Sequence, residues 1–143
     1  MGVGKTTVGR VLAERLGASF VDLDCAVGDI PALWKAGGEA HFRALERETL
    51  RHAAAGDGVL ALGGGTLESE VNREMLRGWR VVVLLAMPET LQERMKQPAN
   101  RPLAAQWRTL LDTRMPVWLG YGAPVWVDGL DAAAVGEQVL ARC

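Results

Sequence analysis

The sequence opens with a glycine-rich turn that carries a lysine and a threonine and leads straight into a helix. Gly2-Val3-Gly4-Lys5-Thr6 matches the second half of the phosphate-binding pattern G-x-x-x-x-G-K-[ST]. In such a loop the backbone N–H groups and the helix N-terminus hold phosphate oxygens, the lysine reaches the outer phosphates, and the hydroxyl binds magnesium. Apolar residues at helical spacing predict an amphipathic helix over residues 4–16. Taken alone, the glycines could equally form an ordinary turn before that helix.

The leading glycine of this pattern, and the strand that precedes such a loop, would fall before Met1. A central strand buries roughly four or five aliphatic side chains at about 1.5–3 kcal/mol each, comparable with the whole stability of about 5–15 kcal/mol. We therefore expect the natural start to lie roughly ten residues upstream, with Met1 an internal methionine of the loop. The alternative is an inactive, N-terminally truncated relative that binds nucleotide or a partner without turnover, or that does not fold.

Short apolar runs alternate with helical stretches along the rest of the chain. The expected strands are 20–24, 59–62, 79–85 and 124–127, and the expected helices are 39–55, 68–77, 88–96, 106–117 and 132–141. This alternation predicts an α/β fold with a parallel sheet covered by helices. With 143 residues the chain can bury one core, so we expect a single domain over 1–143. Residues 97–105, with two prolines and no apolar period, are expected to form a loop.

Composition narrows the class of function. The chain has 16 Lys plus Arg against 17 Asp plus Glu and no basic cluster, which argues against nucleic-acid and membrane partners and favours small molecules. The longest apolar run, 81–87, is far shorter than the roughly 20 residues that span a bilayer, and no signal peptide is evident, so we expect a cytoplasmic protein. Cys25 and Cys143 have neither disulfide nor zinc spacing and are expected to be free thiols.

Two aspartates end the strand expected at 20–24. As alternate residues of one strand, Asp22 and Asp24 would point to the same side and repel each other unless a cation or a donor lay between them. Together with the phosphate loop, this pair suggests a magnesium site. The plainer alternative is an aspartate that caps the next helix, followed by an exposed turn.

Six segments, in this order, resemble the shikimate kinase family. They are G-K-T-T at 4–7, F-V-D-x-D at 20–24, F-R-x-L-E at 42–46, the triple glycine at 63–65, N-R-P-L at 100–103 and R-M-P at 114–116. The resemblance spans nearly the whole chain, and the third and fourth segments separate it from gluconate kinases and adenylate kinases. It implies a three-layer P-loop NTPase fold, like that of nucleoside-monophosphate kinases, from which the first central strand is missing here.

The same resemblance implies an ATP-dependent small-molecule kinase. It would phosphorylate the 3-hydroxyl of shikimate, a step of aromatic amino-acid biosynthesis, with ATP and Mg²⁺, and it would be a monomer. The segments between Asp24 and Arg43 and between Arg101 and Arg114 are shorter than the family pattern. A related kinase for another hydroxylated acid, such as gluconate, is therefore the alternative.

At the nucleotide end, the resemblance implies roles for residues around the phosphate loop and the 97–105 lid. The residues expected to bind the nucleotide are Gly2, Gly4, Lys5, Thr6, Thr7 and Arg101. Lys5 would stabilise the β- and γ-phosphates, and Arg101 would close over the transferring group. Thr6 would ligate magnesium, and Asp22 would hold the metal's shell through water. Asp24, the third residue expected to be catalytic, would orient the acceptor hydroxyl or take its proton.

At the acceptor end, the resemblance implies a substrate-binding helical region at 25–55. The acceptor would contact Asp24, Arg43, Gly63, Gly64, Gly65 and Arg114. Arg43 and Arg114 would grip the carboxylate with planar guanidinium groups, and Glu46 would fix Arg43 through an i, i+3 pair. Trp34 could line the pocket or simply pack. The plainer alternatives are a surface pair for Arg43, an ordinary turn for the glycines and a helix-end charge for Arg114.

Overall fold

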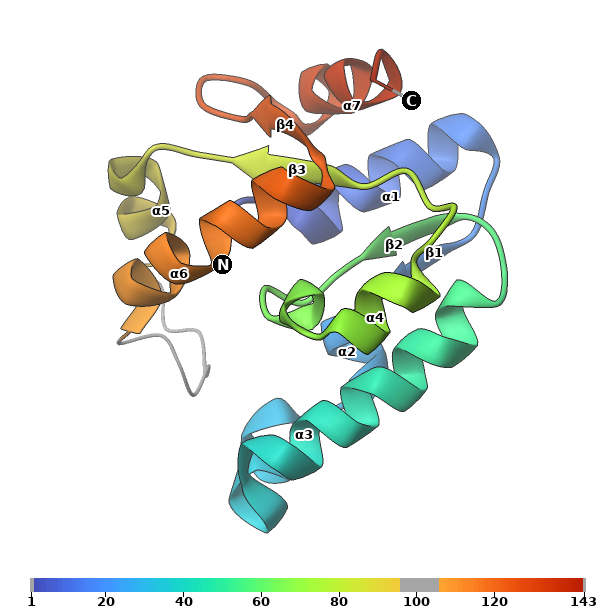
Figure 1. The fold of residues 1–143 in the computed structure, drawn as a ribbon. Coiled ribbons are helices and arrows are strands. Elements are labelled where there is room, and N and C mark those ends of the chain that lie inside the picture. Colours follow the sequence, from blue (N-terminus) through green and yellow to red (C-terminus); the bar gives the residue numbers. More distant parts are fainter. Residues whose placement is uncertain (1, 96–105, 143) are drawn as a thin grey trace.

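Alternating strands and helices make up the computed structural model, which describes residues 2–95 and 106–142 (Figure 1). The elements, in chain order, are α1 (Lys5–Leu16), β1 (Phe20–Asp22), α2 (Leu23–Val27), α3 (Ile30–Ala54), β2 (Val59–Ala61), the 3₁₀ turn η1 (Thr66–Glu68), α4 (Glu70–Met75), β3 (Val82–Leu85), α5 (Pro88–Met95), α6 (Trp107–Tyr121), β4 (Ala123–Trp126) and α7 (Ala132–Leu140). The predicted α/β alternation is confirmed. The loop expected at 97–105 lies outside the described residues.

The strands form two separate parallel pairs. β1 pairs with β2, from Phe20 opposite Val59 to Asp22 opposite Ala61, and β3 pairs with β4. Within the described residues β2 and β3 do not pair with each other. Their side chains, with those of α1, line an apolar cavity of about 410 Å³ that Val3 also reaches. The predicted parallel strands are therefore present, but as two half-sheets rather than one continuous sheet.

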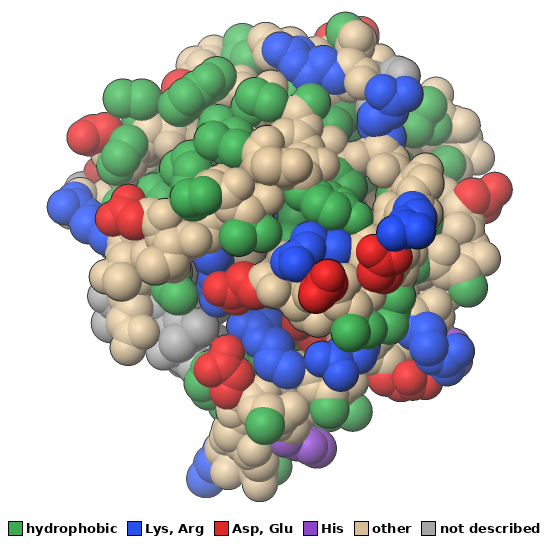
Figure 2. Space-filling model, viewed as in Figure 1, with side chains coloured by type: hydrophobic (Ala, Val, Ile, Leu, Met, Phe, Trp, Pro, Cys, Tyr) green, Lys and Arg blue, Asp and Glu red, His purple; other side chains and the backbone are tan. Residues whose placement is uncertain are grey.

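The hydrophobic core is divided in the same way. One cluster joins α1, β4 and α7 through Val8, Leu12, Val125, Val127, Val135 and Val139. A second cluster, on the side of β1 and β2, contains Leu23, Leu50, Leu67 and Leu76. In Figure 2, hydrophobic side chains gather over the upper half of one face, above a band where acidic and basic side chains alternate. The division is incomplete, because Val59 of β2 also packs against the first cluster.

Helix α3 is the longest helix of the described residues. It begins at Ile30, earlier than the predicted residue 39, because Asp29 accepts a hydrogen bond from the Ala32 amide and Pro31 lies in the first turn. Gly38, at φ 69°, kinks the helix. No helix in the described ranges is both long enough and apolar enough to cross a membrane.

The prediction of a strand over 20–24 is wrong at its end. The strand stops at Asp22, whose Oδ1 accepts a hydrogen bond from the Cys25 amide at 3.3 Å and so caps α2. Aspartate at an N-cap stabilises a helix start, and this local preference ends the strand two residues early. Asp22 and Asp24 are therefore not alternate residues of one strand. The helix expected at 68–77 is likewise shorter, comprising η1 and α4.

Candidate active site

Most of the predicted site residues line one cavity of about 580 Å³ beyond the carboxyl ends of β1 and β2. The predicted members that line it are Lys5, Asp24, Arg43, Gly63, Gly64, Gly65 and Arg114. Trp34, left open by the sequence, also lines it, with its ring centroid 6.2 Å from that of Phe42. Ligands of parallel α/β proteins bind at this edge of a sheet.

The start of α1 forms one end of the site. Gly4 precedes the helix at φ 96°, a left-handed conformation that glycine adopts without strain, and it has no side chain to cap the first helical amides. Those amides are suited to an anion. The carbonyl oxygens of Gly2 and Val3 accept hydrogen bonds from Arg94 of α5, at 3.3 and 3.4 Å, a contact that sequence reasoning missed. Gly2 and Thr7 are exposed and do not line the cavity.

Thr6 and Asp22 meet beside this loop. The Thr6 hydroxyl donates to Asp22 Oδ2, while Asp22 Oδ1 caps α2. Hydroxyl and carboxylate oxygens are the ligands that Mg²⁺ prefers, usually together with phosphate oxygens and water. No group of three or more His, Cys, Asp or Glu that could hold a metal occurs in residues 2–95 and 106–142. The oxygen atoms of Thr6 and Asp22 fit a magnesium ion that takes its remaining ligands from elsewhere.

The carboxylate of Asp24 lies against the first glycine of the triple glycine. A Cβ at Gly63 would come within 2.8 Å of Asp24 Oδ1 and within 2.9 Å of Glu46 Oε1. Real Cβ atoms do not approach other atoms so closely, so glycine is needed for this packing. A Cβ at Gly64 would make only ordinary contact, 3.5 Å from Arg114 Nη1. Neighbouring side chains therefore leave no room for a Cβ at Gly63, whereas one at Gly64 would fit.

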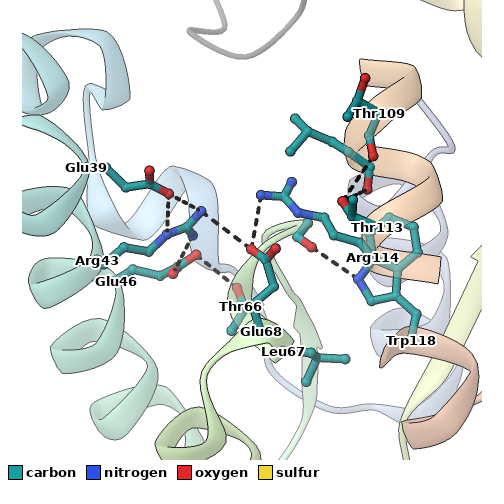
Figure 3. A network of polar contacts seen from close by, with 12 residues as sticks. Glu39, Arg43, Glu46, Thr66, Leu67, Glu68, Thr109, Thr113, Arg114 and Trp118 are labelled. Atoms are coloured by element: carbon teal, nitrogen blue, oxygen red, sulfur yellow. Dashed lines mark hydrogen bonds and ion pairs between the residues drawn. The ribbon is translucent and has the colours of Figure 1, made fainter. Parts of the chain in front are cut away.

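Arg43 is held by a buried carboxylate (Figure 3). Its Nη1 donates to Glu46 Oε2 at 2.8 Å, and Glu46, only 1% exposed, also accepts from the Thr66 hydroxyl at 2.9 Å. Burial alone lowers the pKa of Arg43, but hydrogen bonds and charge from Glu46 and Glu39 outweigh it, so its pKa lies above the usual value. Arg43 is therefore a fixed, permanently charged group, as the i, i+3 spacing predicted.

Arg114 faces Arg43 from α6. Its side chain is 10% exposed, its Nη2 lies 3.1 Å from Glu68 Oε2, and its Nε has no hydrogen-bond partner among the described residues. A buried donor without an acceptor is costly unless a ligand supplies one. One turn further along α6, Trp118 Nε1 donates to the Gly64 carbonyl at 3.1 Å and ties this helix to the triple glycine.

Sequence reasoning missed Thr66, Glu68 and Trp118. Trp118 carried a usable signal, because it lies four residues after Arg114 and hence on the same helical face. Thr66 and Glu68 carried none, since they meet Glu46 and Arg114 only through the tertiary fold. Arg101, the predicted lid arginine, lies outside the described residues.

Comparison with known proteins gives a consistent picture. The family model "Shikimate kinase" matches residues 1–115. The shikimate kinase of Streptomyces coelicolor is 46% identical, over 98% of this chain and 89% of that protein. A shikimate kinase of Thermus thermophilus is 38% identical, over 99% of this chain and 85% of that protein.

Solved structures agree with these relatives. The shikimate kinase of Acinetobacter baumannii in complex with shikimate superposes with a TM-score of 0.87 at 34% identity, over 98% of this chain and 86% of that one. The shikimate kinase of Bacteroides thetaiotaomicron gives a TM-score of 0.85 at 29% identity, over 99% of this chain and 90% of that one.

Proposed function

Because the chain belongs to the shikimate kinase family, we propose that it transfers the γ-phosphoryl group of ATP to the 3-hydroxyl of shikimate. This reaction gives ADP and shikimate 3-phosphate, a step of aromatic amino-acid biosynthesis. The observation that carries the proposal is that Lys5, Asp24, Arg43 and Arg114 line one cavity. A cation for phosphate, a base for a hydroxyl and two guanidinium groups for a carboxylate are what this transfer needs.

At the nucleotide end, the amides at the start of α1 hold the phosphates and Lys5 neutralises charge on the outer ones. Thr6, already in contact with Asp22, would ligate magnesium, and Asp22 would hold the metal's shell through water. When bound, Mg²⁺ offsets the negative charge that develops on the transferring group. Transfer is then mainly a matter of positioning.

At the acceptor end, Arg43 and Arg114 bind the carboxylate of shikimate and thereby turn its 3-hydroxyl toward Asp24. The Asp24 carboxylate accepts the hydroxyl proton as the hydroxyl oxygen bonds to the γ-phosphorus. The bond between that phosphorus and the β–γ bridging oxygen breaks, and ADP leaves with the electron pair. Gly63 permits this arrangement, since a side chain there would displace Asp24.

Further parts of the proposal concern larger segments. Residues 25–55 act as the substrate-binding region, supported by Arg43 and Trp34, which project from α3 into the cavity. Arg101 and the 97–105 lid cover the transferring group. A cytoplasmic location and a monomeric state stay predictions from the sequence.

A coupled assay of ADP release tests the reaction. Turnover with shikimate and none with gluconate is expected, and the reverse would favour the kinase for another hydroxylated acid. Asp24→Asn should abolish turnover while ATP binding stays nearly unchanged, because the amide cannot take the proton. Asp112→Asn, the same change at an exposed position of α6, is the control. Normal turnover by the Asp24 variant would remove Asp24 from its assigned role.

A further inference from the structure

One carboxylate occupies the space between the two guanidinium groups assigned to the acceptor. Glu68 Oε2 lies 3.1 Å from Arg114 Nη2 and 4.0 Å from Arg43 Nη2 (Figure 3). A Cβ at Gly65 would meet Arg43 Nη2 at 2.5 Å and Glu68 Oε2 at 2.7 Å, so Gly65 lies against both of these side chains. An internal carboxylate therefore stands where an incoming carboxylate would bind both arginines.

The carboxylates around this point differ in how firmly they are held. Glu46 is buried and fixed by two hydrogen bonds, so it stays on Arg43 whatever binds. The Glu68 side chain is 44% exposed and ends the short turn η1. Because water reaches the Glu68 carboxylate, this half-exposed ion pair is weaker than a fully buried one. Glu39, 56% exposed, also contacts Arg43 Nη2, at 3.3 Å, but of these carboxylates it is Glu68 that also pairs with Arg114 and can be displaced from it by a ligand.

Arg114 shows the consequence most clearly. Its ion pair with Glu68 engages Nη2 and leaves the buried Nε without an acceptor among the described residues. A planar carboxylate that binds the guanidinium through two parallel hydrogen bonds could engage Nε and one Nη together. Glu68 thus satisfies Arg114 only in part, which leaves a ligand carboxylate the better partner.

We propose that Glu68 is an internal competitor for the acceptor's carboxylate and sets the affinity of this kinase for anionic acceptors. In the free protein it neutralises Arg114, and it turns out to solvent when the acceptor binds. This inference rests on the proposed function, because it takes Arg43 and Arg114 as the site of the acceptor's carboxylate. Glu68 acts on the ground state alone, so it affects KM and leaves kcat unchanged.

The test replaces Glu68 with glutamine, which removes the negative charge of the side chain and keeps its size and shape. Glu68→Gln should lower KM and the calorimetric Kd for shikimate about two- to five-fold, the range expected for losing a partly exposed competing ion pair. The kcat should be unchanged, and Glu68→Ala should act in the same direction. Glu14→Gln, the same change on an exposed position of α1, should alter neither constant. An unchanged or higher KM in the Glu68 variants, or a lower kcat, would overturn the proposal.

A second variant distinguishes a failure of the role of Glu68 from a failure of the proposed carboxylate site. Arg114→Lys should raise KM for shikimate, because an ammonium cannot replace the planar fork. If it does so while Glu68→Gln leaves KM unchanged, the role of Glu68 fails and the carboxylate site stands. If Arg114→Lys has no effect on KM, the carboxylate site itself is wrong and both proposals fall.

Discussion

Replacing Glu46 with alanine would test whether Arg43 is held in place from within the core. Glu46 is 1% exposed, and its two oxygens accept from Arg43 Nη1 at 2.8 Å and from Thr66 Oγ1 at 2.9 Å. Alanine removes both acceptors at once. Thr66 is fully buried, whereas the Arg43 side chain is 23% exposed and can turn toward water.

These contacts set the size of the effect. A buried hydroxyl left without an acceptor costs about 1–3 kcal/mol. The cavity left by the lost side-chain atoms adds roughly 1 kcal/mol, and the partly exposed Arg43 adds less than about 1 kcal/mol. Part of this is offset because a carboxylate need no longer be desolvated. We expect a net loss of about 2–4 kcal/mol, or a fall in Tm of about 6–15 °C for a domain of this size.

Thermal unfolding followed by circular dichroism measures this loss, and steady-state kinetics with shikimate should show a raised KM because Arg43 is no longer oriented. Glu48→Ala is the matched control. Glu48 lies on the same helix, is exposed, and pairs with Arg51 and His52 only at the surface. If Tm falls by the same amount in both variants, Glu46 does not anchor the site from the core. The assignment of Arg43 to the acceptor's carboxylate then loses its structural basis.

Three further changes have defined outcomes. Gly65→Ala should raise KM for shikimate at least about tenfold, because the new Cβ would lie 2.5 Å from Arg43 Nη2. Gly120→Ala is the control and should leave KM unchanged, because its Cβ would meet no described atom within 4 Å. The hydrogen bond from Arg51 lowers the pKa of Glu48 to about 2, so Arg51→Gln should raise that pKa toward 4.5 in a carboxyl NMR titration. If the pKa of Glu48 stays the same in this variant, the hydrogen bond from Arg51 is not its cause. A fused apolar strand of about five residues ahead of the phosphate loop should raise Tm by filling the cavity between the half-sheets, and a Gly-Ser segment of equal length should not.

Local patterns were enough to predict most of the elements and the pairing of Arg43 with Glu46 on one helix face. The assignment of Arg43 and the triple glycine to the acceptor site needed the resemblance, and their proximity is a tertiary property. Arg114 needed the resemblance, because nothing near it in sequence tells a ligand-binding arginine from a helix-end charge. Its near-complete burial is a tertiary property.

Asp22 is a residue for which the plainer interpretation, a helix cap, is confirmed, while the cation site stays a prediction. Spacing favoured a cation site, and the plainer interpretation favoured a helix cap. In the structure one carboxylate oxygen caps α2 and the other accepts from Thr6. The cap fixes the carboxylate so that its second oxygen faces the phosphate loop. The strand end was misplaced because the capping preference of Asp22 outweighed the apolar run before it. The direct hydrogen bond between Thr6 and Asp22 was not predicted, because it depends on how α1 and β1 pack together.

The divided sheet bears directly on catalysis. Asp24 and the triple glycine belong to the half built on β1 and β2, while β3, β4 and α7 form the other, and α1 contacts both. Lys5 and Gly63 line both the apolar cavity and the polar one, so the two spaces adjoin at the proposed site of phosphoryl transfer. Transfer depends on how Lys5 and Asp24 are placed relative to each other, so the fused apolar strand should raise kcat in the coupled assay of ADP release along with Tm.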